Sequence, residues 1–77
     1  DETTLPEIVF ALRRYVDFGH ETEITSSANL YTNLLDQYGG QTKDGNMLDS
    51  LTFRAEHSNT EVNSACHTAV QKYCSIE

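Results

Sequence analysis

Two cysteines, Cys66 and Cys74, carry the most distinctive chemistry of this chain, and both lie in the stretch SACHTAVQKYC. They are eight residues apart, which on a continuous helix corresponds to an axial rise of about 12 Å. A disulfide requires the two Cα atoms to lie within about 7 Å of each other. The spacing therefore excludes a Cys66–Cys74 disulfide if this stretch is helical.

Three arrangements of the two cysteines fit the sequence. In the first, both thiols are reduced and buried, where cysteine behaves as a small hydrophobic residue. In the second, the helix ends before Cys74 and the two sulfurs can meet. In the third, Cys66 and Cys74 each form a disulfide to a cysteine elsewhere, for instance in another chain, which an oxidising secreted environment favours.

Three histidines, His20, His57 and His67, could join the thiols around a metal ion. Zinc sites usually contain a Cys-x₂₋₄-Cys or a His-x₃₋₅-His pair, and this sequence contains neither. The carboxylates around segment 39–46 do not follow the alternate-position pattern of a calcium loop. We therefore expect no metal and no other cofactor, and a protein that works by binding rather than as an enzyme.

LDSL at residues 48–51 resembles the Asp-Ser-Leu phosphopantetheine site of acyl and peptidyl carrier proteins, and EITSSANLYTNL at 23–34 resembles the loop that precedes that site. The resemblance implies that Ser50 is the modified residue. Carriers place this serine soon after the loop and continue from it into a long apolar helix. In this chain some 15 residues intervene and only 27 follow Ser50, so a divergent carrier is an alternative rather than the main prediction.

The first helix is predicted over about residues 5–18. Thr4 and Glu7 match a Thr-x-x-Glu capping box, Pro6 fits the first turn, and apolar residues recur at helical spacing up to a stop at Gly19. Three aromatic residues widen the apolar surface of this helix: Phe10, Tyr15 and Phe18.

A short strand or linker is predicted at 21–25, a second helix over about 27–38, and a polar loop over 39–47. SLTFRAEH at 50–57 alternates apolar and polar side chains, which predicts a half-buried strand. Such a strand needs a ladder partner, and the only internal candidate is the short segment 21–25.

Residues 60–74 have a nearly ideal amphipathic helical pattern. The elements together predict one small domain, residues 1–77, of a helix-rich α+β class: three helices and one or two strands, in a small sheet that another chain would complete. The partner surface would then comprise six side chains of the last strand and helix: Leu51, Phe53, Ala55, Val62, Val70 and Tyr73.

The chain has a net charge of −7, which disfavours binding to nucleic acid or to an anionic membrane surface. No apolar run approaches the roughly 18 residues that a membrane-spanning helix needs. The first residue is Asp and no signal-peptide apolar run follows it, which favours a processed product.

LTFRAEHSNTEVNSACHTAVQKYC at 51–74 is similar in layout to small secreted fungal killer toxins and effector-like proteins, in which a strand leads into a helix with an Ala-Cys pair and a second cysteine. We predict a processed, secreted subunit of a toxin-like or effector-like assembly that contacts another protein chain in a hetero- or homo-oligomer. The alternatives are a structural or regulatory subunit of a larger complex, for which a cytoplasmic location would fit, and the divergent carrier modified at Ser50.

Overall fold

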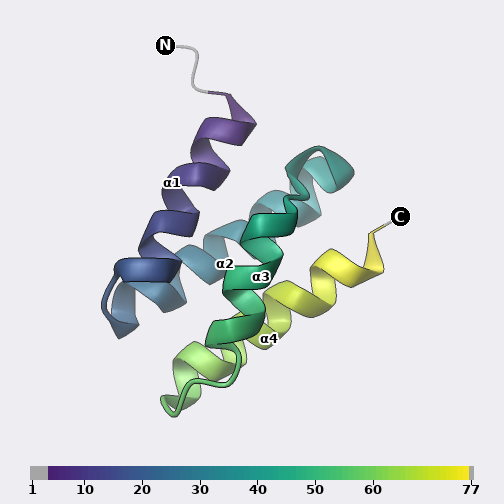
Figure 1. Cartoon of the computed structure of the whole chain (residues 1–77). Helices are drawn as coiled ribbons and strands as arrows, with labels where there is room; N and C mark the ends of the chain where they lie inside the picture. The colour runs from purple at the N-terminus through teal and green to yellow at the C-terminus, as the bar shows by residue number, and fades with distance from the viewer. Residues whose placement is uncertain (1–3, 77) are drawn as a thin grey trace.

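The computed structural model describes residues 4–76, and within this range the chain forms helices and no strand. The elements are α1 (Leu5–Phe18), α2 (Glu21–Tyr38), the 3₁₀ turn η1 (Gly39–Thr42), α3 (Gly45–Arg54) and α4 (Thr60–Ser75), as Figure 1 shows. The predicted α+β class is therefore wrong, because the described part of the chain is all-helical.

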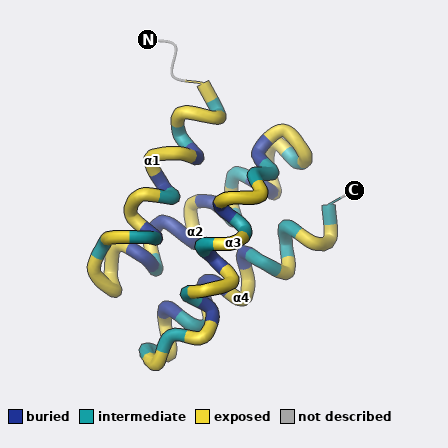
Figure 2. The backbone as a smooth tube through the Cα atoms, viewed as in Figure 1, coloured by how far each residue is buried: buried dark blue, intermediate teal, exposed yellow. Residues whose placement is uncertain are grey.

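Each of the four helices packs on two others and together they enclose one core. α1 packs on α2 and α3, and α4 packs on the same two helices from the other side, with the most extensive contact between α2 and α4. Buried residues lie on the inward sides of all four helices (Figure 2). The core is small, and its largest fully buried side chain is Tyr31, whose hydroxyl donates a hydrogen bond of 2.7 Å to the carbonyl oxygen of Thr42.

The limits predicted for the first helix are confirmed by α1. The amide of Thr4 donates to the Glu7 carboxylate at 3.0 Å, which completes one half of the predicted capping box. Gly19 ends the helix, and only Gly19 and His20 separate α1 from α2. A Cβ atom at Gly19 would lie 2.5 Å from the Tyr15 carbonyl oxygen of α1 and 2.9 Å from the Glu23 carboxylate of α2, so this tight junction favours glycine.

α2 begins at Glu21, six residues before the predicted start, so the short strand at 21–25 is also wrong. The amide of His20 donates to the Glu23 carboxylate at 2.9 Å and starts the helix. Ile24 adds a buried residue one turn before Ala28. The helix ends as predicted, where Gly39 has a φ of +63°, a conformation that favours glycine.

The strand predicted over 50–57 is wrong, because α3 covers Gly45–Arg54, and this helix also takes the last residues of the predicted loop 39–47. The side chain of Asp44 accepts hydrogen bonds from the amides of the second and third helical residues at 2.8 and 3.1 Å, as a helix N-cap does. Because no strand needs a ladder partner among the described residues, the argument that another chain completes a sheet no longer holds.

The last helix is confirmed: α4 spans Thr60–Ser75, and the Asn59 side chain caps it by accepting hydrogen bonds from the amides of Glu61 and Val62.

A side chain at the end of α3 binds the end of α1. The Arg54 guanidinium donates to the carbonyl oxygens of Val16 and Asp17, at 2.8 and 2.6 Å, which satisfies carbonyl groups that the end of a helix leaves without partners.

Candidate functional site

Cys66 and Cys74 lie on one continuous helix and form no disulfide with each other, as the helical spacing predicted. Cys66 is fully buried in the core, where it acts as a small hydrophobic residue, whereas Cys74 is exposed on the last turn of α4. The folded domain therefore withholds Cys66 from any partner. An intermolecular disulfide at Cys74 stays a prediction.

The predicted partner surface is divided between the core and the solvent. Leu51, Ala55 and Val62 are at most 5% exposed and belong to the core. Val70 and Tyr73 are half-buried and pack against it. Phe53 is 74% exposed, and its ring lies 5.5 Å from the Arg54 guanidinium carbon. Of these six residues, only Phe53 presents most of its side chain to a partner.

Ser50 lies half-buried in α3, five residues after the first residue of that helix. The resemblance to carrier proteins implied a serine from which a helix begins. In this structure Asp44 caps the helix instead, so the chain around Ser50 lacks the arrangement that the resemblance implied.

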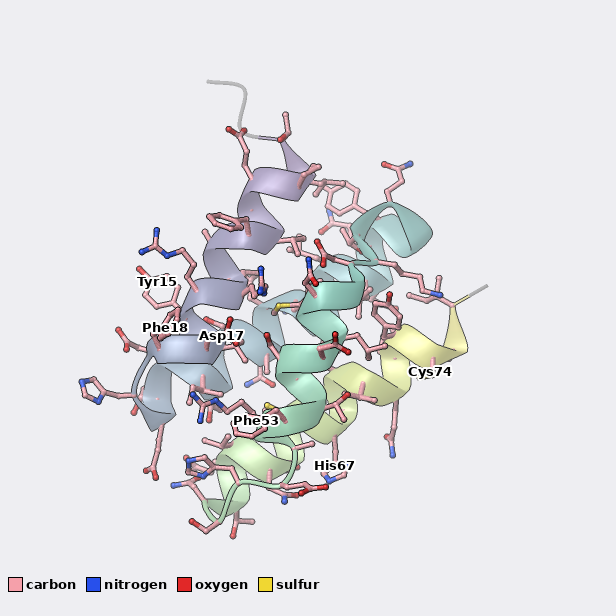
Figure 3. The ribbon with its side chains drawn as sticks, viewed as in Figure 1. Tyr15, Asp17, Phe18, Phe53, His67 and Cys74 are labelled. Atoms are coloured by element: carbon pink, nitrogen blue, oxygen red, sulfur yellow. The ribbon has the colours of Figure 1, made fainter. Side chains whose placement is uncertain are left out.

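Three exposed apolar side chains, Tyr15, Phe18 and Leu30, lie where α1 meets α2. We define the α1–α2 face as Ala11, Tyr15 and Phe18 on α1 together with Ser26 and Leu30 on α2. Phe18 is 84% exposed, Tyr15 51% and Leu30 47%. Figure 3 shows Tyr15 and Phe18 pointing away from α3 on the outer side of α1. A soluble domain leaves single apolar residues exposed routinely, but a cluster of them usually marks an interaction surface.

Two adjacent hollows shape this face. The first, about 390 Å³, lies beside Ala11 and Phe18 at the α1–α2 junction, and the second, about 310 Å³, lies farther along α2 beside Ser26 and Leu30. Tyr15 lines both hollows, as does Glu23. The face therefore offers two apolar recesses with an aromatic ring between them and a carboxylate at their border.

Four of the five cations of the chain are bound internally. Arg13 pairs with Asp17 at 3.6 Å and Lys72 with Asp36 at 2.6 Å, while Arg54 binds main-chain carbonyls of α1. The Lys43 ammonium donates to the carbonyl oxygen of Ile76 at 2.9 Å and lies over the Tyr73 ring. Within residues 4–76, Arg14 at the first hollow is the one cation that makes no ion pair and no hydrogen bond.

Most of the described carboxylates, in contrast, form no ion pair. Glu21 and Glu23 lie in the first turn of α2 and accept hydrogen bonds from neutral groups, the Asn59 amide and the His20 main chain. The carboxylates of residues 4–76 that no Lys or Arg neutralises are Glu7, Glu21, Glu23, Asp44, Asp49, Glu56 and Glu61. The net charge is therefore negative, and most individual carboxylates on the surface also remain without a cationic partner.

The opposite side of α2, where it meets α4, has a different character. Two further open hollows on that side are lined mainly by uncharged polar residues, including Thr25, Asn29, Thr32, Ser64 and Thr68. These side chains resemble an ordinary solvated surface, and the hydroxyl groups of Thr32 and Thr68 already bond to main-chain carbonyls of their own helices. The hollows on this side of α2 therefore lack the exposed aromatic side chains that line the α1–α2 face.

Three pKa shifts have structural causes. Burial raises the pKa of the Cys66 thiol to about 11, and burial also raises the pKa of the Tyr31 phenol. The hydrogen bond from the Thr4 amide lowers the pKa of Glu7 in the capping box. Each group serves packing or capping, and none of the three lines the hollows of the α1–α2 face.

Within the part of the chain that the structure describes, no three His, Cys, Asp or Glu side chains lie together as metal ligands would. None of the described helices has the length and apolar character that a membrane span requires. Of the residues of the α1–α2 face, the sequence singled out Tyr15 and Phe18, as aromatics that widen the apolar surface of the first helix. The sequence did not show that α2 starts early enough to form the other wall.

We compared the chain with models of protein families, with curated proteins and with solved structures, and none of them matches it.

Proposed function

We propose that this chain acts by binding another protein, and that the α1–α2 face is the docking surface. The observation that carries the proposal is the exposure of Phe18, 84%, beside two hollows that share Tyr15. Aromatic residues dominate the energetics of protein interfaces. Burying one such side chain contributes about 2–3 kcal/mol in gross terms, which is the scale of an interface hot spot.

The proposal moves the docking surface away from segment 50–57. Leu51 and Ala55 are used by the core, and the exposed Phe53 is not among the residues that line the hollows. The toxin or effector role, the secreted location and the structural or regulatory alternative stay predictions, and a protein-binding face is compatible with each of them.

A peptide-display selection tests the docking role and does not require the natural partner. A random peptide library is panned on the folded domain, and the selected peptides are then titrated against wild type and against the Phe18→Ser variant. The selected peptides are expected to bind wild type at least about tenfold more tightly than Phe18→Ser, a difference of about 1.4 kcal/mol. They should also lose affinity for Tyr15→Ser, because its ring lines both hollows.

Phe53→Ser is the matched control, since it removes a similarly exposed phenylalanine from another helix. The free energies of unfolding of Phe18→Ser and Phe53→Ser are expected to lie within about 0.5 kcal/mol of the wild-type value, as is usual for surface substitutions. Peptides that bind Phe18→Ser as well as wild type, or a selection that enriches no peptide, would contradict the docking role.

A further inference from the structure

We infer that the partner segment that occupies the α1–α2 face is a cationic amphipathic helix. The inference rests on the proposed docking role and adds the chemistry of the partner to it. Three properties of the domain support it: the unneutralised carboxylates, the shape of the two hollows and the absence of any strand in residues 4–76.

The charge of the domain favours a cationic partner. Glu23 borders both hollows, Glu21 lies in the same first turn of α2, and neither is paired with a cation. The start of a helix is itself partly positive, yet these two carboxylates make this end of α2 acidic. The net charge of −7 adds a long-range attraction for a basic partner, which speeds association and penalises acidic partners.

The shape of the face favours a helix. An amphipathic helix presents anchor side chains at positions i, i+3 or i+4, and i+7, and neighbouring anchors lie about 5–6 Å apart. Two hollows that share Tyr15 can receive two such anchors, and the small side chains of Ala11 and Ser26 let a helix approach closely. A peptide that binds by strand addition would need a sheet edge, and residues 4–76 provide none.

The same charges make a second copy of this chain the poorer occupant. A symmetric dimer through the α1–α2 face would place the carboxylates of one copy close to those of the other. Only Arg14 at the border of the first hollow could compensate them, and two chains of charge −7 repel each other at long range. An anionic membrane surface is disfavoured for the same reason.

Defined synthetic peptides test the inference directly. The first probe is an amphipathic helix of leucine and lysine with about 14 residues, or four helical turns. The second has the same leucine positions with glutamate in place of lysine. The third has the composition of the first in an order without helical periodicity. Titrations of ¹⁵N-labelled domain followed by NMR give both the affinity and the residues contacted.

The lysine helix is expected to bind at least about tenfold more tightly than either other peptide and to shift amide signals of residues 11–30. Binding should weaken about tenfold or more when the ionic strength rises from about 0.05 M to about 0.5 M, which shortens the Debye length from about 14 to about 4 Å. Phe18→Ser should abolish the complex, whereas Phe53→Ser should leave its affinity within about twofold.

Glu23→Gln tests whether the charge of Glu23 contributes to peptide binding independently of the stability of the domain. Glutamine keeps an oxygen that can accept the His20 amide hydrogen bond, as capping boxes allow, but it removes the negative charge at the hollows. We expect this variant to weaken the lysine helix several-fold and to leave the melting temperature of the domain close to that of wild type. Arg14→Gln should strengthen the same complex, because it removes the cation beside the first hollow.

Several results would overturn the inference. If the glutamate helix binds as tightly as the lysine helix, the partner need not be cationic. If the non-periodic peptide binds as tightly as the lysine helix, the partner need not be helical. If display-selected peptides need Phe18 while the lysine helix does not bind, the inference fails and the docking role stands. The same holds if sedimentation equilibrium shows a dimer that Phe18→Ser dissociates. If no peptide of either kind binds, both fail.

Discussion

α1 and α4 are amphipathic helices of similar length, 14 and 16 residues, on opposite sides of the bundle, yet they use their apolar residues differently. α4 turns nearly all of its apolar residues inward: Val62, Ala65, Cys66 and Ala69 are buried, and Val70 and Tyr73 are partly buried. α1 buries Val9, Leu12 and Val16 but leaves Phe10, Tyr15 and Phe18 more than half exposed.

The difference separates a helix whose apolar residues lie almost entirely in the core from one that also exposes large aromatic side chains. The side chains of α4 that face the core are small, so this helix approaches α2 closely, and the Lys72–Asp36 ion pair joins the two helices at the surface. α1 carries more apolar surface than the small core can cover. Phe10, Tyr15 and Phe18 therefore remain exposed, and Tyr15 and Phe18 line the hollows of the α1–α2 face.

The largest expected effect is a loss of stability, and it is tested by comparing a buried leucine with an exposed leucine on the same helix. Leu35 of α2 is 1% exposed and lies in the core, whereas Leu30 is 47% exposed on the α1–α2 face. Leu35→Ala should lower the free energy of unfolding by about 2–5 kcal/mol, because it removes buried methyl groups and leaves a cavity. Chemical denaturation measures this loss.

Leu30→Ala is the control for that substitution. It should cost no more than about 1 kcal/mol while reducing the affinity of peptides selected on the wild-type face. Equal losses of stability in the two variants would mean that the α1–α2 face is part of the core, and the distinction between the two sides of the molecule would be wrong.

The elements that the sequence predicted well carry local signals that agree with their packing. The first helix has a capping box and a stop at Gly19, and the last has an Asn cap followed by an uninterrupted apolar stripe. Segment 50–57 was predicted as a strand because Phe53 falls off the helical face that contains Met47, Leu51 and Ala55. The structure buries those three residues and exposes Phe53, so the alternating pattern came from an aromatic residue outside the core.

The start of α2 shows a second limit. Segment 21–25 contains Ile24 as its only large apolar residue, and sequence alone does not show that this residue completes a core stripe one turn before Ala28. The candidate site depends on that turn, since Glu23 and Ser26 form its second wall. The aromatics of α1 were therefore evident from the sequence, whereas the groove beside them required the structure.

A smaller effect is expected from enlarging one alanine in each helix. Ala69 of α4 is fully buried, and leucine there would overpack the contact with the core. We expect Ala69→Leu to cost about 1–3 kcal/mol. Ala11 of α1 is exposed and lines the first hollow, so Ala11→Leu should change stability by no more than about 0.5 kcal/mol. It should instead reduce peptide binding by filling the hollow.

Thermal melts and peptide titrations of the two variants measure both quantities. If Ala69→Leu retains full stability, α4 is packed loosely and is not the closed side of the bundle. If Ala11→Leu leaves peptide binding unchanged, the first hollow does not take part in docking.

The smallest effect concerns the two cysteines of α4, which differ in burial on the same helix. Because burial raises the pKa of Cys66 to about 11 from its ordinary value of 9.0, its thiol stays neutral in the folded state while it ionises in the unfolded state. The folded state therefore binds the proton more tightly than the unfolded state does. Its contribution to the free energy of unfolding is fully present below pH 9 and is lost as the pH rises toward 11. Stability should fall by about 1 kcal/mol between pH 8 and 9.5.

Denaturant titrations at several pH values measure this slope. Cys66→Ala should remove most of it, whatever its effect on stability at neutral pH, and Cys74→Ala should preserve it. In the native protein a thiol-specific reagent should modify the exposed Cys74 rapidly and reach Cys66 only at the rate of opening or unfolding. Equal reactivity of both thiols would show that the contact between α4 and the core opens readily, contrary to the closed packing that distinguishes α4 from α1.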